Sequence, residues 1–186
     1  MINTIELTLE PFSQIHDARY MMYWLALTNK GYQAYVNSLA NIEKEKPALE
    51  KRTIDYVATG EQQPETDHAM KSYRSGTGIN MDEFYREARG EGFFNYDLAT
   101  NSEISLSLFV RYWGGEYGNR KFDIYIDDKK LITEDNTGRW NQSLFKDVVY
   151  PIPDSMVKGK SHVRIKFEAP RGSTTGAVYV VRLLKQ

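Results

Sequence analysis

The stretch LSLFVRYWGGEYGNRKFDIYIDD (Leu106–Asp128) decides the fold of this chain. Two segments carry an apolar side chain at every second position, which gives each segment one apolar face: Ile104, Leu106, Leu108, Val110 and Tyr112 in the first, and Phe122, Ile124 and Ile126 in the second. This period of two predicts two half-buried strands. Turn-forming residues connect them, namely Gly114, Gly115, Gly118 and Asn119. We therefore predict a hairpin that forms the spine of a β-sandwich.

The composition restricts the possible function classes. The 186 residues include 24 basic and 25 acidic ones, without the basic stripe of a nucleic-acid-binding protein or the polybasic run that binds an anionic membrane. The absence of Cys excludes disulfides, thiolate metal sites and thiol catalysis within this chain. No apolar run reaches membrane-spanning length, and residues 1–28 lack the pattern of a signal peptide.

Three regions follow one another along the chain. In residues 1–28, Ile5, Leu7 and Leu9 alternate with polar residues, which predicts strands that either pack on the main domain or are the tail of a preceding β module. Residues 29–59 show apolar side chains at helical spacing and predict a helical connector, with a kink or restart at Pro47. Residues 60–186 predict a jelly-roll β-sandwich.

The third region contains short strand candidates separated by turn signals. The candidates are 69–75, 91–97, 104–113, 121–126, 146–151, 162–169 and 176–184. The turn signals are Ser75-Gly76, Asp127-Asp128, Thr137-Gly138, Pro153-Asp154, Lys158-Gly159 and Arg171-Gly172. Short strands with regular turns predict an all-β fold, a jelly roll of about eight strands.

Catalytic motifs are weak. The chain has no G-x-S-x-G elbow, and its three His (His16, His68 and His162) are too scattered for a zinc site. The glycine-rich runs RGEG (89–92) and RGSTTG (171–176) lack the P-loop ending and predict β-turns. Carboxylates near Glu61, Glu65 and Glu87 leave a stand-alone glycosidase as the least favoured alternative.

Two aromatic and polar loops are the candidate binding residues. A sugar ring stacks its apolar face on Trp or Tyr, while Asn, Glu and Arg side chains bind its hydroxyls. The candidates are Trp113, Glu116, Tyr117 and Arg120 in one loop, and Asn136, Arg139 and Trp140 in the other. The alternative interpretation is that the two Trp side chains pack against a neighbouring domain or cover the end of a sheet.

Two further motifs carry a family resemblance. The first is GEQQPE-x-DH, with Glu61, Gln62, Gln63, Pro64, Glu65, Asp67 and His68. The second is R-x-A-R-G-x-G-F-F-x-Y-D-L, with Arg86, Arg89, Phe94, Tyr96 and Asp97. With the surrounding sequence they resemble the C-terminal region of β-L-arabinofuranosidases of glycoside hydrolase family 127, which are common in gut Bacteroidetes.

The resemblance implies an accessory role. In that family an α/α-barrel catalytic module comes first and β-sandwich modules follow, the last one galactose-binding-like. The family's catalytic Cys and zinc ligands belong to the barrel, so the resemblance implies a non-catalytic domain of a secreted or periplasmic polysaccharide-degrading enzyme. Its expected partners are the preceding catalytic and β modules and plant-cell-wall oligosaccharides, and neither nucleic acid nor membrane is expected.

Two functions of such a domain stay open. It binds carbohydrate, or it is a structural domain that buttresses the catalytic module. We expect no cofactor. Jelly rolls of this type often carry a stabilising calcium ion, for which we assign no ligands.

Overall fold

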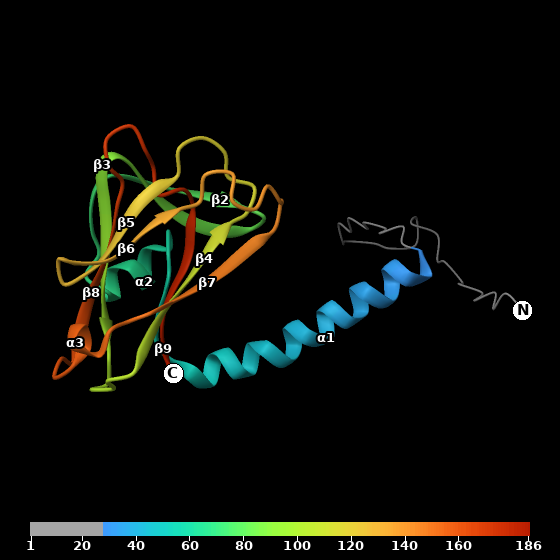
Figure 1. Ribbon diagram of the computed structural model, residues 1–186, viewed down its shortest axis with the longest axis horizontal. Coiled ribbons are helices and arrows are strands. Elements are labelled where there is room, and N and C mark those ends of the chain that lie inside the picture. The colour runs from blue at the N-terminus through green and yellow to red at the C-terminus, as the bar shows by residue number, and fades with distance from the viewer. Residues whose placement is uncertain (1–27) are drawn as a thin grey trace, which may run out of the picture. The chain divides into compact units, whose positions relative to one another are not determined.

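The computed structural model describes residues 28–186 (Figure 1). The chain divides into two units at Glu43 and Lys44, and helix α1 (Asn29–Arg52) contributes to both. The strand predicted around Ile5 lies outside the described residues. No helix between residues 28 and 186 has the length and apolar character needed to cross a bilayer.

The predicted connector is helical only in its first part. Helix α1 continues through Pro47 and ends at Arg52. Strand β1 (Thr53–Ala58) then pairs with the C-terminal strand, with Thr53 opposite Leu184. The β-branched side chains of Ile54 and Val57 favour this extended segment. The domain limits predicted at residues 28 and 59 stay a prediction.

The unit from Lys44 onward is a jelly-roll β-sandwich, as predicted. After β1 the elements are α2 (Gln62–Asp67), β2 (Lys71–Asn80), β3 (Glu83–Ala99), β4 (Leu106–Trp113), β5 (Lys121–Ile126), β6 (Lys129–Asp135), β7 (Phe145–Pro151), α3 (Asp154–Val157), β8 (His162–Glu168) and β9 (Val178–Lys185). All strand pairs are antiparallel, in the order β6-β5-β8-β3-β9-β4-β7, with β1 added to β9 and β2 added to β3.

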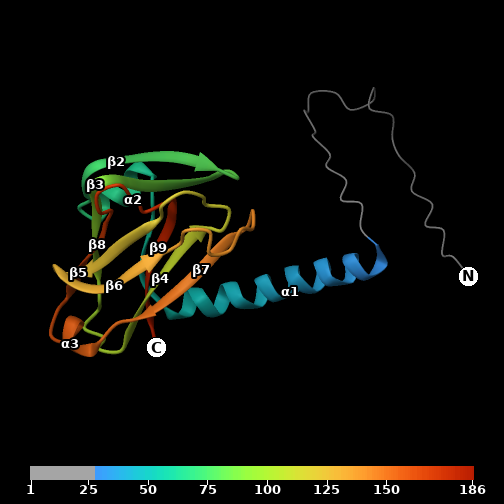
Figure 2. The ribbon, with the colours of Figure 1, turned by 45° about the horizontal axis from the view of Figure 1, so that its top comes forward.

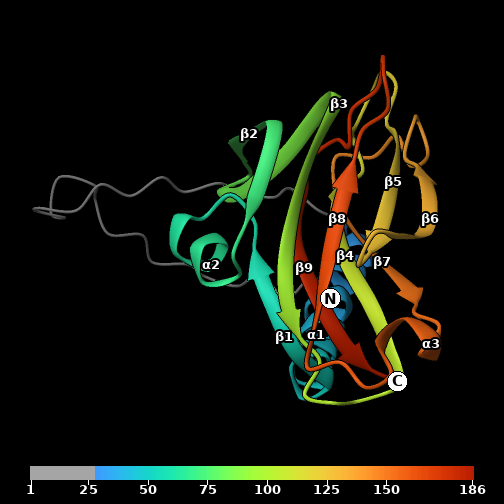
Figure 3. The same cartoon turned by 90° about the vertical axis from the view of Figure 1, so that its left-hand side faces the viewer.

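The long strand β3 joins the two sides of the curled sheet (Figure 3). Its second half pairs with β8, from Phe93 to Ala99. β2 pairs with its first half and also with Phe93–Asn95, and the ladder between β3 and β9 consists of the pair Arg86–Val178. The β2–β3 hairpin therefore forms an arm on one side of the sandwich (Figure 2).

The core lies between the two sides and contains the apolar faces predicted from the sequence. Leu106, Leu108, Val110 and Tyr112 of β4 are buried, as are Phe122, Ile124 and Ile126 of β5. Phe94, Leu98, Ile165, Phe167, Val181 and Leu183 complete the central layer. Full burial of such a side chain stabilises the fold by about 1.5–3 kcal/mol. Ile104, predicted on the same face, precedes β4 and is exposed.

The predicted hairpin between β4 and β5 is wrong. In the sheet, β9, β3 and β8 lie between these strands. β4 pairs with β7 and β9, which come much later in the sequence. The alternating pattern identified two core strands, but it contained nothing that specified their pairing partners. The glycine-rich segment is a crossover connection from β4 to β5.

Three local predictions also change. Ser75-Gly76 lies inside β2 and is not a turn, and RGEG (89–92) lies inside β3. β6 was missed because its side chains are mostly polar and exposed. The turn at Asp127-Asp128 is confirmed, since both residues have positive φ values, 45° and 64°, between β5 and β6.

Candidate functional site

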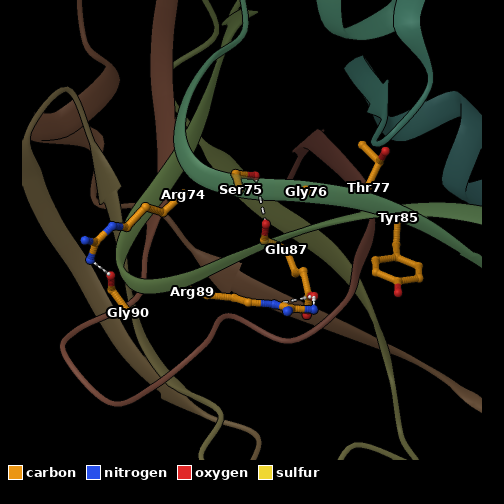
Figure 4. Close-up of a pocket in the computed structure, with 8 residues that line it drawn as sticks. All are labelled: Arg74, Ser75, Gly76, Thr77, Tyr85, Glu87, Arg89 and Gly90. Carbon is orange, nitrogen blue, oxygen red and sulfur yellow. Dashed lines mark hydrogen bonds and ion pairs between the residues drawn. The ribbon is translucent and has the colours of Figure 1, made fainter.

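A cleft of about 650 Å³ lies on the β2–β3 hairpin (Figure 4). It is lined by Arg74, Ser75, Gly76, Thr77, Tyr85, Glu87, Arg89 and Gly90. Its volume falls within the range of small-ligand sites in proteins, about 300–1,000 Å³. The side chains of Tyr85, Glu87 and Arg89 point to one side of the hairpin, because alternate residues of a strand share a face.

Two glycines of β2 open this face of the hairpin. Gly76 lies opposite Glu87, and Gly78 lies opposite Tyr85. A Cβ atom on Gly78 would come within 2.5 Å of the Tyr85 ring, so the ring rests directly on the β2 backbone. A Cβ atom on Gly76 would meet nothing within 4 Å. The missing side chain at Gly76 therefore leaves open space beside Tyr85.

Charged groups lie next to the Tyr85 ring. Arg89 Nε donates a hydrogen bond of 2.8 Å to Glu87 Oε1, and the Glu87 carboxylate raises the pKa of Arg89. Arg89 remains 74% exposed at its side chain, whereas Glu87 is 14% exposed. Arg74 Nη1 donates to Gly90 O at 2.9 Å and lies 3.6 Å from the Glu91 carboxylate.

A β-bulge positions the two arginines. The β2–β3 register shifts between Tyr73 and Ser75, and Arg74, Gly90 and Glu91 all have positive φ values. Between the pairs Tyr73–Phe93 and Ser75–Ala88, β2 has one residue and β3 has four, and such an irregularity re-aims the neighbouring side chains. A Cβ atom on the nearby Gly92 would lie 2.6–2.8 Å from three backbone oxygens, so the crossing of the two strands requires glycine there.

The other face of the hairpin holds a buried ion pair. Arg86 Nε and Nη2 donate to Glu65 Oε1 and Oε2, each at 2.6 Å. Gly60 N and Tyr96 OH also donate to Glu65 Oε1, at 2.7 Å each. Burial acts to raise the pKa of Glu65, but the hydrogen bonds from Arg86, Gly60 and Tyr96 outweigh it and hold that pKa below its ordinary value.

A smaller cleft of about 440 Å³ opens above this pair. Its lining is Gly60, Gln62, Glu65, Thr66, Ala69, Met70, Thr77 and Arg86. The two charged members are already saturated by protein partners. The arrangement therefore attaches α2 to β3.

The GEQQPE-x-DH motif builds this attachment. Gln63 Nε2 donates to Asp67 at 2.7 Å, and the ring of His68 contacts Pro64 O at 2.6 Å and Asp55 at 3.2 Å. Glu61 is the N-cap residue of α2 without a side-chain cap.

The second motif divides between core, surface and cleft. Phe94 and Tyr96 are core residues, and Asp97 pairs with Arg164 at 2.7 Å. Of the members of the two motifs, Arg89 and Gly90 line the larger cleft.

The two predicted binding loops lie side by side. Asn136 N donates to Arg120 O at 3.1 Å, and Arg120 N donates to Thr137 Oγ1 at 2.9 Å. Glu116 accepts hydrogen bonds from Arg120 Nε at 2.6 Å and from Ala177 N at 2.8 Å. The backbone of Arg120 thus connects the two loops, and the side chain of Glu116 connects Arg120 to the segment before β9.

The remaining loop candidates have different environments. Trp140 stacks on Tyr112 at 6.4 Å and packs against the core. Arg139 covers the Trp140 ring at 4.6 Å, and Asn136 is buried. Tyr117 is 83% exposed. A binding role for these loops stays a prediction.

Sequence reasoning missed Arg74 and Tyr85, and it named Glu87 only as a carboxylate of the glycosidase alternative. A usable signal exists: Tyr85, Glu87 and Arg89 alternate along one strand, and the neighbouring segment contains Gly76 and Gly78. The signal becomes specific only with the register that brings the glycines opposite Glu87 and Tyr85.

The described part of the chain contains no group of three or more His, Asp and Glu side chains that could hold a metal ion. The arrangement in the larger cleft instead suits an uncharged or weakly charged ligand. An aromatic face beside the paired carboxylate and guanidinium of Glu87 and Arg89 binds molecules that combine an apolar face with a rim of hydroxyls.

Comparison with known proteins gives one family match. Residues 48–184 match the profile of a family described as "Family of unknown function (DUF6805)". The comparison with curated proteins found no match.

Several solved structures are similar to this chain. An exo-beta-1,3-galactanase from Phanerochaete chrysosporium with beta-1,3-galactotriose has a TM-score of 0.52 at 9% identity, over 71% of this chain and 29% of that chain. The plant receptor-like kinase ANX1 has a TM-score of 0.50 at 14% identity, over 71% and 42%. A family 35 carbohydrate binding module from Clostridium thermocellum has a TM-score of 0.48 at 17% identity, over 63% and 92%.

Proposed function

The chain belongs to DUF6805, a family of unknown function, and we propose from its site that it is a non-catalytic domain that binds carbohydrate in the β2–β3 cleft. The observation that carries this proposal is the Tyr85 ring, which lies on Gly78 beside the paired side chains of Glu87 and Arg89. The ring offers a flat apolar surface to the C–H face of a sugar. The carboxylate accepts hydrogen bonds from its hydroxyls, and the guanidinium donates to them.

A binding titration tests the proposal. Galactose, β-1,3-galactotriose and arabinan oligosaccharides serve as probes in isothermal titration calorimetry. We expect saturable binding of at least one probe by the wild-type domain, and its loss in the variants Tyr85→Ala and Glu87→Gln.

The variant Gly76→Leu sharpens the test. A Cβ atom at this position meets nothing within 4 Å. We therefore expect the Leu side chain to enter the cleft and block the ligand, and thermal unfolding of the variant checks that the fold is kept. The control Lys129→Leu adds the same apolar group to an exposed strand residue away from the cleft. Absence of saturable binding by the wild-type domain across the probes would favour the alternative function, a structural domain that packs on another module.

We also propose a larger context for the domain. The resemblance to glycoside hydrolase family 127 supports an accessory role in a secreted polysaccharide-degrading enzyme, with preceding catalytic and β modules as its partners. A reading frame that joins this domain to an α/α-barrel module with clustered Cys would support this context. Release of sugar from aryl glycosides by the purified chain would contradict the non-catalytic assignment.

A further inference from the structure

A row of aromatic rings leads away from the Tyr85 end of the cleft. The Tyr85 ring lies 5.5 Å from the Tyr179 ring, which lies 4.9 Å from the Phe145 ring. The Phe145 ring lies 5.3 Å from the Trp113 ring. The four residues come from β3, β9, β7 and β4. Residues from four separate strands thus form one row of rings in contact with one another, which we name the aromatic row.

Polar contacts hold the hairpin arm against this row. Asn80 Nδ2 donates to Tyr179 OH at 3.1 Å, and Glu83 lies 3.6 Å from Arg111. Arg111 also makes two hydrogen bonds to Asp147, at 2.8 and 3.0 Å, and lies 5.8 Å from the centre of the Phe145 ring. The relative positions of the cleft and the row are therefore fixed before any ligand arrives, which lowers the entropic cost of binding.

The rings of the row differ in exposure. Tyr179 is 2% exposed and supports its neighbours from below. Tyr85, Phe145 and Trp113 are half-buried, so each presents part of its ring to solvent. The Trp113 indole folds over Gly115, where a Cβ atom would lie 2.6 Å from Nε1. The side chain at the far end of the row is thus fixed in position by the backbone beneath it.

We propose that the binding surface continues from the cleft along the aromatic row to Trp113, so that the domain binds a stretch of several sugar units within a glycan chain. This inference rests on the proposed carbohydrate function and specifies its ligand class. A single sugar fills the cleft beside Tyr85 and Glu87. Further units of the same chain lie over Phe145 and Trp113, because successive sugars each offer an apolar face to an aromatic ring.

The dependence of affinity on chain length tests this inference. Galactose and β-1,3-linked galacto-oligosaccharides of two to six units are titrated into the wild-type domain, and arabinan oligosaccharides of the same lengths form a second series. We expect the dissociation constant to fall at least tenfold between the single sugar and the longer oligomers. The variant Trp113→Ala is expected to lose most of this gain while its affinity for the single sugar changes less than twofold.

Two further measurements keep the result clear. Trp140→Ala removes the other loop Trp, which packs on the core, and should keep the full dependence on length. In the wild-type protein, long oligomers should change the fluorescence of Trp113 and the single sugar should not, with Trp113→Phe removing the signal.

The possible failures are distinguishable. If the affinity is equal for all lengths, or if Trp113→Ala has the same effect at every length, the proposed extended site is wrong. The cleft then remains the proposed binding site. Absence of binding at every length overturns the proposed function and this inference together.

Discussion

Arg86 and Glu65 face each other through two hydrogen bonds of 2.6 Å, one from each side of the guanidinium fork, and both residues are more than 90% buried. They connect β3 to α2 directly beneath the hairpin arm. Removing one partner of a buried pair leaves the other charge uncompensated. This pair therefore controls how firmly the arm is attached.

Glu65→Gln should destabilise the fold by about 3–5 kcal/mol, because Arg86 keeps its charge in a buried site. Chemical denaturation at pH 7 measures the loss. The double variant Glu65→Leu/Arg86→Met removes both charges and should recover much of the stability. A double variant as unstable as the single one would show that packing, and not the uncompensated charge, causes the loss.

The same pair predicts an acid dependence. The pKa of Glu65 lies below its ordinary value of 4.5 in the folded chain. The unfolded chain therefore takes up the proton first, and the stabilisation is fully present above pH 4.5 and is lost as the pH falls through the lower folded pKa. The free energy of unfolding should fall more steeply below pH 4.5 in the wild type than in Glu65→Gln. Parallel curves would contradict this prediction.

Tyr179 predicts an alkaline dependence. Burial raises the pKa of Tyr179 to about 12 from an ordinary value of 10.0. Between these values the unfolded chain has released the proton and the folded chain still holds it, so stability falls as the pH rises from 10 to 12. One such group contributes a slope of about 1.4 kcal/mol per pH unit. Tyr179→Phe should remove this one contribution to the slope of the free energy of unfolding against pH. Urea unfolding at pH 10–11 measures it, with the wild type in the same buffers as the control.

Gly92 and Gly76 form a matched pair for the packing of the arm. Gly92→Ala brings a Cβ atom within 2.6–2.8 Å of three backbone oxygens and should cost about 1–3 kcal/mol through overpacking. Gly76→Ala meets open space and should be neutral or stabilise by about 0.4–1 kcal/mol, because it restricts the unfolded chain. Thermal unfolding of the two variants compares them directly. Equal effects would show that the crossing at Gly92 relaxes.

Trp140→Ala should separate stability from binding. Trp140 packs on Tyr112 and the core but is half-buried. The loss should therefore stay below the roughly 3–5 kcal/mol of a fully buried Trp. Calorimetric titration of a glycan that the wild type binds should give an unchanged affinity. A tenfold weaker affinity would return Trp140 to the binding surface.

The jelly roll could be predicted because its core strands obey a local rule. Leu106, Leu108 and Val110 lie on one face of an extended chain whatever pairs with it, and all three are buried as their alternation predicts. The alternation did not show that Ser107 and Phe109 on the other face are buried as well. The partner of β4 is not a local property. β7 and β9 reach it from the far end of the sequence, and nothing in the glycine-rich connection excluded β5.

The candidate cleft escaped prediction for two physical reasons. Gly90 and Glu91 have the positive φ values of a turn but form a bulge inside a strand. The sequence pattern therefore did not identify the first half of β3 as a strand. The open space also depends on Gly76 lying opposite Glu87, which only the register of the hairpin fixes. The predicted loops, in contrast, were conspicuous because they combine Trp with charged residues. Trp113 remains part of the proposed extended site, whereas Trp140 packs on the core.

The pairing of β1 with β9 has a practical consequence. Thr53 lies opposite Leu184, and Arg52 Nε donates to Lys185 O at 2.9 Å. The first and last strands of the sandwich therefore lie side by side, and its two ends are neighbours. A fold whose ends are neighbours can be circularly permuted or inserted into a loop of another protein with little disturbance to either partner. The sandwich is therefore suited to such a rearrangement. A short linker between its ends and a new opening at the exposed Lys158-Gly159 turn would change the connectivity while the cleft stays on the β2–β3 hairpin.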